Sequence, residues 1–195
     1  RSLPVFAHAF AGPVLFGSPL IEVGYTPFIL FIGGASGKGK TETARLAQCL
    51  WGDFPTKERM AGFGSTTTVN RQEAARCIGG LWVIDDYKRQ KVVNEAQMAA
   101  ENMFTDYADM QSRKKGTPGA KVISSLPIKC MLLVTAEDAA LSQTAALARS
   151  LQVDFCQEGD TTAIYQRCQA MSARYRTVMA PFIAWWQRQD HQIWL

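Results

Sequence analysis

The sequence predicts an α/β fold, a three-layer sandwich with a mainly parallel sheet and a C-terminal helical appendix. Apolar runs at Phe28–Ile32, at Leu81–Ile84 and, with one lysine, at Ile128–Val134 are typical of strands that are buried on both faces. Segments with helical periodicity separate these runs, and such alternation indicates a parallel sheet covered by helices. With 195 residues, the chain is long enough for one domain of this kind and too short for two full catalytic domains.

The composition limits the class of protein. With 47% hydrophobic and 19% charged residues, the chain is expected to be globular, and its net charge of +4 permits contact with nucleic acid without establishing it. The five cysteines form no C-x-x-C pair, which argues against a zinc site or a disulfide framework and favours a reduced, cytoplasmic protein. Proline and glycine interrupt the apolar start, Leu3–Phe16, so no membrane span is expected.

Three segments are expected along the chain. Residues 1–26 should form a helical or irregular segment that packs on the core, because prolines and glycines divide an apolar stretch there. Residues 27–156 hold the alternating strands and helices, and therefore the core. Residues 157–195 are expected to form a C-terminal helix or small lid.

The helices of the core are predicted from apolar spacing and capping residues. Thr41–Trp51 has apolar residues on one side and ends before Gly52. Asn70 and Glu73 have the spacing of a capping box, which predicts a short helix that begins there and ends near Ile78. Apolar residues from Val92 to Tyr107 recur every three or four positions, which predicts a further helix.

The second half of the chain has three further elements. The lysine- and glycine-rich stretch 111–125 lacks periodicity and is expected to form an exposed loop or hairpin. Leu151–Phe155 alternates like a strand with one solvated face. Apolar residues from Ile164 to Trp185 recur every four and three positions, which predicts one long helix, kinked near Pro181 and packed on its own domain.

One motif indicates nucleotide binding. Residues 34–41 fit the pattern G-x-x-x-x-G-K-[ST] and lie between a buried apolar run and a helix, which is the context that a phosphate-binding loop requires. Lys40 would bind the β/γ-phosphate oxygens and Thr41 would bind Mg²⁺, so ATP and Mg²⁺ are the expected ligands. The predicted nucleotide-binding residues are Gly34, Ala35, Ser36, Gly37, Lys38, Gly39, Lys40, Thr41 and Glu42.

Two adjacent acids follow the second apolar run. Asp85 stands where a strand is expected to end near the phosphates, so it is the predicted magnesium ligand together with Thr41. Asp86 fits the residue that orients or deprotonates the attacking water, although two adjacent surface acids are also common without a role.

Two further residues are candidates for catalysis. Thr135 follows the third apolar run and fits either a contact to the γ-phosphate or water, or a local turn residue. Arg149 precedes the last strand and fits either an arginine finger that acts across a subunit boundary, or an ordinary surface arginine.

A basic segment is the candidate nucleic-acid contact. Residues 113–129 contain five basic residues and no acid, and such a segment suits a phosphate backbone; a solvated loop is the alternative, since aromatic residues for base stacking are missing. The residues expected to contact single-stranded DNA are Arg113, Lys114, Lys115 and Lys121, with Lys129 as a fifth charge.

These motifs together resemble the P-loop ATPase modules of phage and plasmid primase–helicase replication proteins, which are related to superfamily-three and AAA+ helicases. The resemblance rests on the phosphate loop, on Leu81–Asp86 as a Walker B strand, on residues 135–138 and 147–151, and on the closing helix Met179–Trp186. It implies a P-loop NTPase sandwich and an ATP-driven motor on DNA that forms a homo-oligomeric ring with composite ATP sites. It also assigns the family's catalytic roles to Lys40, Thr41, Asp85, Asp86, Thr135 and Arg149.

Two other functions share the same phosphate loop. A small-molecule kinase would normally have an arginine-rich lid, whereas residues 139–149 contain a single arginine, Arg149. A slow nucleotide-dependent assembly switch would bind ATP without DNA-stimulated turnover.

Overall fold

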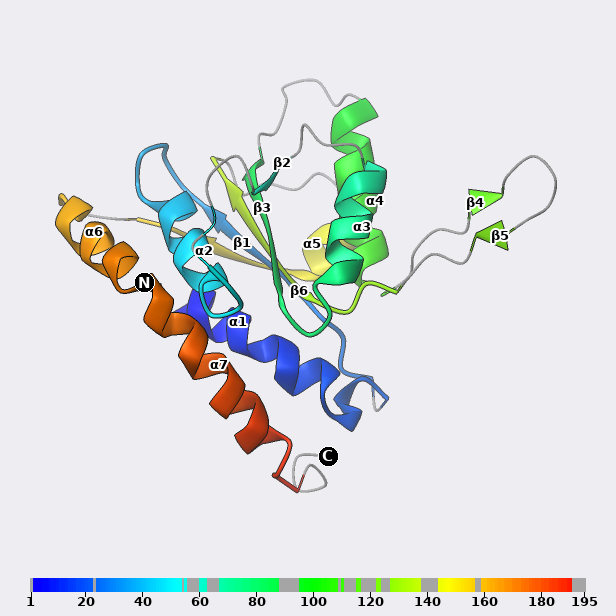
Figure 1. Cartoon of the computed structure of the whole chain (residues 1–195). Coiled ribbons are helices and arrows are strands. Elements are labelled where there is room, and N and C mark those ends of the chain that lie inside the picture. Colours follow the sequence, from blue (N-terminus) through cyan, green and yellow to red (C-terminus); the bar gives the residue numbers. More distant parts are fainter. Residues whose placement is uncertain are drawn as a thin grey trace.

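A five-stranded, all-parallel sheet forms the centre of the molecule, with the strand order β2-β3-β6-β1-β7 (Figure 1). The strands are β1 (Ile29–Gly33), β2 (Ala61–Gly62), β3 (Leu81–Tyr87), β6 (Met131–Ala136) and β7 (Ser150–Asp154). The computed structural model describes residues 2–22, 24–53, 55, 60–62, 67–87, 95–108, 110, 115–116, 122–123, 127–137, 144–156 and 159–190.

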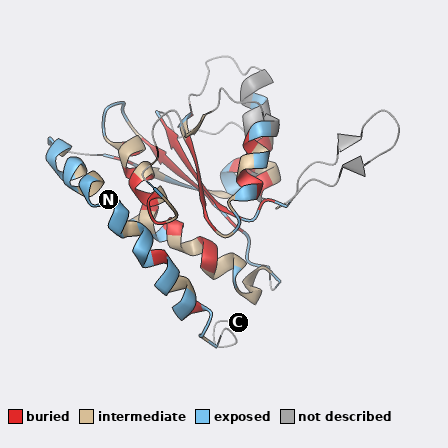
Figure 2. Cartoon of the chain, viewed as in Figure 1, coloured by how far each residue is buried: buried red, intermediate tan, exposed pale blue. Residues whose placement is uncertain are grey.

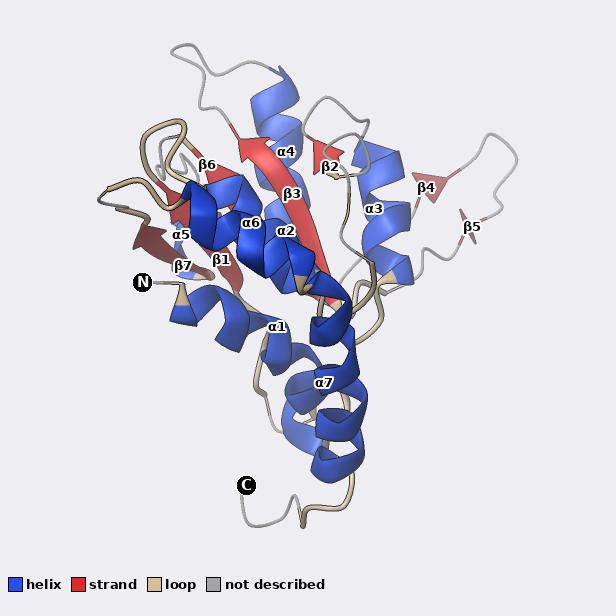
Figure 3. Ribbon diagram, turned by 60° about the vertical axis from the view of Figure 1, so that its left-hand side comes forward, coloured by secondary structure: helices blue, strands red, loops and turns tan. Residues whose placement is uncertain are grey.

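Helices cover both faces of the sheet, as the sequence predicts. One layer contains α1 (Leu3–Phe16), α2 (Lys40–Gln48) and α7 (Ser172–Trp186), and the other contains α3 (Thr67–Arg76), α4 (Glu95–Ala108) and α5 (Thr144–Ala148). A short helix, α6 (Thr162–Ala170), lies beside α2, and a 3-10 turn, η1 (Pro19–Ile21), follows α1 (Figure 3).

The two cores are formed by alternate residues of the same strands. Phe31 and Leu132 pack toward α3 and α4, whereas Leu30 and Leu133 pack toward α1 and α2. Every residue of β1 and β6 is buried, which explains why these strands appear in the sequence as continuous apolar runs (Figure 2).

The N-terminal segment contains a regular helix where the sequence predicts an apolar stretch interrupted by proline and glycine. Pro4 lies in the first turn of α1, where no intrahelical N–H bond is needed, and Pro13 lies inside the helix. Gly12 touches the chain before β3, since a Cβ at this position would lie 2.2 Å from the carbonyl oxygen of Gly79. Gly12, which in the sequence suggests an interrupted helix, is therefore the point where α1 packs against the core.

The backbone of one residue near the start of β6, Leu132, joins the two layers. The Tyr107 hydroxyl, from α4, accepts a hydrogen bond from the Leu132 N–H (2.9 Å) and donates one to the Cys130 carbonyl (2.7 Å). His8 Nε2, from α1, lies 2.9 Å from the Leu132 carbonyl oxygen. Leu132 thus has polar side-chain partners from both helix layers.

Two predicted helix starts and ends are wrong. The capping box at Asn70 is not a helix start, because α3 begins at Thr67 and Asn70 is buried inside it, with its amide 3.5 Å from the Gly62 carbonyl oxygen. The helix predicted to extend to Trp51 ends at Gln48 and continues as turns.

The predicted long C-terminal helix is divided at Met171 into α6 and α7, and Pro181 lies within α7. Met179 is buried in the same core cluster as residues of α1, and Trp186 is also buried, whereas the residues spaced by seven along the predicted apolar stripe are exposed. These exposed residues are Ile164, Met171, Val178 and Trp185.

The basic segment contains a two-stranded antiparallel hairpin, β4 (Lys115–Gly116) and β5 (Val122–Ile123), which agrees with the predicted loop or hairpin. Arg113, Lys114 and Lys121 lie outside the described residues. The last strand, β7, is an edge strand, and Leu151 is 48% exposed there although its alternation predicts an inward side chain.

Candidate nucleotide-binding site

The phosphate loop connects β1 to α2 at the carboxyl edge of the sheet. Gly34, Gly37 and Gly39 all have positive φ (141°, 74° and 83°), a conformation that glycine adopts without steric cost. A Cβ at Gly34 would also lie 2.7 Å from the Phe155 carbonyl oxygen. The loop ends at the N-terminus of α2, whose N–H groups make this end of the helix suitable for binding an anion.

Lys40 is 8% exposed, and its side chain is hydrogen-bonded to the backbone of the phosphate loop. Its Nζ donates to the carbonyl oxygens of Gly34 (2.5 Å) and Ala35 (2.8 Å). Burial lowers the pKa of the Lys40 ammonium, whereas the nearby carboxylates of Glu137, Asp86 and Asp85 act in the opposite direction. The carboxylates therefore help to keep Lys40 charged, and a charged ammonium that is short of solvent suits an incoming phosphate.

Thr41 and Asp85 meet, as the magnesium prediction requires. Thr41 Oγ1 donates to Asp85 Oδ1 at 2.9 Å, and Thr135 Oγ1 donates to the same oxygen at 2.5 Å. These are hard oxygen donors of the kind that Mg²⁺ binds with one or two protein ligands and the substrate phosphates. Among the described residues no group of three or more His, Cys, Asp or Glu could hold a metal ion.

A β-bulge presents the two aspartates. Ile84 pairs with Val134 and Tyr87 pairs with Ala136, so Asp85 and Asp86 together stand opposite Thr135. Asp86 has φ 62°, and its N–H donates to Thr135 Oγ1 at 2.8 Å. The strand therefore runs beyond Ile84, where the sequence predicts its end, and the bulge shifts the alternation of side chains after Asp85.

A cavity of about 670 Å³ opens above this cluster. From the predicted nucleotide-binding set it is lined by Ser36 through Glu42, and Asp86 and Thr135 join from the sheet. Gly34 and Ala35 do not line the cavity, but their carbonyl oxygens accept hydrogen bonds from Lys40. Asp85 does not line it either and accepts a hydrogen bond from Thr41.

Several residues that line the cavity were not among the predicted site residues. Glu137 follows β6 directly, and its signal was the position two residues after Thr135, on the same side of an alternating strand. Gly159 through Thr162, Tyr165, Gln166 and Gln169 come from α6 and the turn before it.

Polar contacts hold α6 against the start of α2 (Figure 3). Tyr165 Oη lies 2.7 Å from Thr43 Oγ1 and 3.2 Å from the Gly39 carbonyl oxygen, and Gln169 Nε2 donates to Glu42 Oε2 at 2.6 Å. Apolar periodicity could not reveal these contacts, because they are made by polar side chains between segments more than 120 residues apart.

Arg149 does not join the cavity of its own chain. Its carbonyl oxygen accepts a hydrogen bond from the Ile29 N–H (2.9 Å), at the amino end of β1, whereas the phosphate loop follows the carboxyl end. A five-residue strand separates these ends by about 16 Å. Arg149 could therefore act as an arginine finger only on a nucleotide site of another subunit. That role stays a prediction.

No protein-family model and no curated protein sequence matches the chain. Its structure is similar to a solved structure described as the SCCmec type IV Cch active helicase, with TM-score 0.65 and 13% identity over 92% of this chain and 33% of that one. The JCV helicase matches with TM-score 0.49 and 12% identity over 95% of this chain and 59% of that one.

The similarity to Cch shows a helicase-like P-loop fold and confirms the predicted fold class. The chain spans about a third of the length of the Cch chain. Among the described residues, no helix combines the length and the apolar character needed to cross a membrane.

Proposed function

We propose that this chain is an ATP-hydrolysing motor domain that acts on DNA, in the manner of a replicative helicase of a phage or mobile element. The observation that carries the proposal is the phosphate loop above the Thr41–Asp85 pair, at the floor of a cavity of about 670 Å³. The helicase-like fold supports the motor reading.

ATP binding is assigned to the loop and its helix. Backbone N–H groups of the glycine-rich turn would surround the β-phosphate, and Lys40 would turn from the loop carbonyls to the β/γ oxygens. Thr41 and Asp85 would hold Mg²⁺, which supplies charge neutralisation on the phosphates. Thr135 fixes the Asp85 carboxylate for this task through its short hydrogen bond.

The action on DNA requires partners. Arg149 would complete the site of a neighbouring subunit in a homo-oligomeric ring, since its own site lies at the other edge of the sheet. The basic segment with Arg113, Lys114, Lys115 and Lys121 would follow single-stranded DNA by phosphate contacts. The five cysteines are free thiols, which agrees with a cytoplasmic protein.

The lid of the cavity favours a motor over a small-molecule kinase. The α6 side chains that line the cavity are Tyr165, Gln166 and Gln169, and no arginine is among the described residues around it. A kinase would place arginines there to stabilise the transferred phosphoryl group. A slow assembly switch differs from a motor in its lack of DNA-stimulated turnover.

The first prediction tests this function with Lys40→Ala. ATP hydrolysis with and without single-stranded DNA is followed by phosphate release, and ATP affinity by a fluorescent analogue. Loss of the cation should abolish turnover and greatly weaken binding. Arg76→Ala, an exposed cation on α3, is the matched control and should behave like wild type. Wild-type turnover in Lys40→Ala would disprove the site.

A further inference from the structure

The sheet order places one strand end between the two halves of the site. β6 lies between β1, which leads into the phosphate loop, and β3, which carries the aspartates. Ligands of open parallel sheets bind at the carboxyl ends of such strands. The residue that follows β6 is Glu137, so its position is between the phosphate loop and the bulge.

Main-chain contacts fix Glu137 to both neighbours. Its carbonyl oxygen lies 3.3 Å from the Gly34 N–H nitrogen, and its own N–H donates toward the Tyr87 carbonyl oxygen at 3.4 Å. The loop, β6 and the end of β3 are thereby linked around one residue.

The carboxylate of Glu137 is on the nucleotide side. Leu133 of β6 packs in the core under α2, and Thr135, two residues later, meets Asp85 on the same face. Glu137 continues this alternation, lines the cavity together with Lys40 and is exposed, so that water has access to it.

Glu137 follows the regular end of β6 and lines the same cavity as Lys40, which would bind the β/γ oxygens. Asp86, by contrast, is fixed in the left-handed bulge.

We propose that Glu137, rather than Asp86, is the carboxylate that activates the attacking water. The water oxygen bonds to the γ-phosphorus while one of its protons passes to a Glu137 oxygen. The bond from the γ-phosphorus to the bridging oxygen breaks, its electron pair stays on ADP, and Glu137 returns the proton to solvent. The inference rests on the proposed ATPase function.

Three isosteric variants test the assignment: Glu137→Gln, Asp86→Asn, and the control Glu22→Gln at an exposed glutamate after η1. Binding of a fluorescent ATP analogue with Mg²⁺ and the turnover number with single-stranded DNA are measured for each. We expect Glu137→Gln to bind ATP at least as tightly as wild type and to lose about 10²-fold or more in turnover, as for a lost general base. The loss of turnover in Asp86→Asn should be at least tenfold smaller than that in Glu137→Gln, and Glu22→Gln should turn over like wild type.

Chemical rescue separates a base from a structural residue. Formate, a small carboxylate, should restore part of the turnover of Glu137→Ala and leave the wild type unchanged. Three results would overturn the assignment and leave the ATPase proposal standing. They are turnover of Glu137→Gln within tenfold of wild type, a larger loss of turnover in Asp86→Asn than in Glu137→Gln, and loss of ATP binding in Glu137→Gln. A wild-type chain without ATP binding or turnover would overturn both.

Discussion

Asp86 adopts a backbone conformation that few side chains tolerate. Its φ of 62° belongs to the left-handed region, which aspartate and asparagine enter more readily than other non-glycine residues. In this conformation the Cβ of a β-branched side chain would lie too close to the carbonyl oxygen of the same residue. The strain is located at the bulge that presents both acids, where such strain is often part of a functional site.

The second prediction concerns this strain. Asp86→Val should lower the free energy of unfolding by about 1–2 kcal/mol, the cost of the left-handed conformation for such a residue. Asp154→Val is the matched control, because Asp154 lies exposed in an ordinary strand, β7, and should change stability by less than about 0.5 kcal/mol. Urea denaturation measures both, and equal losses would contradict a strained Asp86.

His8 is a buried neutral imidazole. Burial lowers its pKa from 6.5 to about 4, although the hydrogen bond to Leu132 acts in the opposite direction. The unfolded chain therefore binds a proton near pH 6.5 that the folded chain accepts only near pH 4. Stability is full above pH 6.5 and falls as the pH drops toward 4.

The third prediction follows from this difference. Between pH 6.5 and pH 4 the His8 contribution should fall by about 3 kcal/mol, at about 1.4 kcal/mol for each pH unit. His8→Gln keeps a donor for Leu132 without a titration in this range. The difference in unfolding free energy between wild type and His8→Gln should therefore shrink as the pH falls, and a constant difference would disprove the assignment.

At the scale of elements, α6 differs from the helix that follows it. None of its residues is buried, whereas α7 buries Met179 and Trp186 against the core. Its described polar links to α2 are made by Tyr165 and Gln169. An element with so little buried surface opens at a low free energy, which suits a lid over the phosphate loop.

The β4–β5 hairpin and its flanks carry the fourth prediction. If Arg113, Lys114, Lys115 and Lys121 contact phosphates, neutralising all four should flatten the salt dependence of single-stranded DNA binding by about 0.7 for each lost contact. ATP hydrolysis without DNA should persist, because none of the four handles the nucleotide. Affinity is measured across a salt titration.

The control for the hairpin neutralises four exposed arginines elsewhere. Arg76, Arg167, Arg174 and Arg188 lie on α3, on α6 and along α7 and the turn after it. An unchanged slope in the hairpin variant, or the same flattening in the control, would remove the hairpin from the DNA path.

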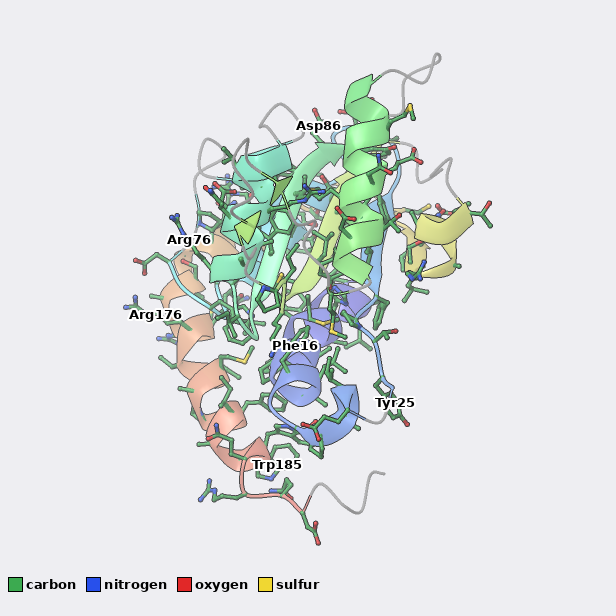
Figure 4. The ribbon with its side chains drawn as sticks, turned by 90° about the vertical axis from the view of Figure 1, so that its right-hand side faces the viewer. Phe16, Tyr25, Arg76, Asp86, Arg176 and Trp185 are labelled. Atoms are coloured by element: carbon green, nitrogen blue, oxygen red, sulfur yellow. The ribbon has the colours of Figure 1, made fainter. Side chains whose placement is uncertain are left out.

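At the scale of the whole molecule, Asp86 lies near one end of the molecule and Trp185 near the other (Figure 4). Arg149 lies at the amino edge of the sheet, away from its own nucleotide site. An arginine finger in this fold therefore requires a neighbouring subunit.

The fifth prediction is a mixing experiment. Arg149→Ala should bind ATP and lose hydrolysis, and Lys40→Ala should lose both. Mixtures of the two should regain turnover at interfaces where an intact Arg149 faces an intact Lys40. Phosphate release is measured across mixing ratios, and only additive residual activity would show that Arg149 does not act in trans.

The sequence predicts the contact between Thr41 and Asp85 because the carboxyl ends of parallel strands meet at one edge of the sheet. It predicts the layers, the three long strands and the phosphate loop because each depends on local chemistry. Apolar runs indicate strands buried on both faces, and the phosphate loop has a fixed spacing. For the N-terminal segment the sequence left a helix and an irregular stretch both open, because Gly12 and Pro13 are poor helix formers that tertiary packing accepts in α1. Tyr165 was missed because its partners lie on α2, far away in sequence.

The joint at Leu132 bears on how the domain carries load. Its N–H bonds to a side chain of one helix layer and its carbonyl to a side chain of the other. Pulling either layer from the sheet would leave a buried polar group unpaired, at a cost of about 1–3 kcal/mol. In the proposed motor, force that a DNA strand applies to one face would thus pass through β6 to the opposite face, and the domain would resist as a unit.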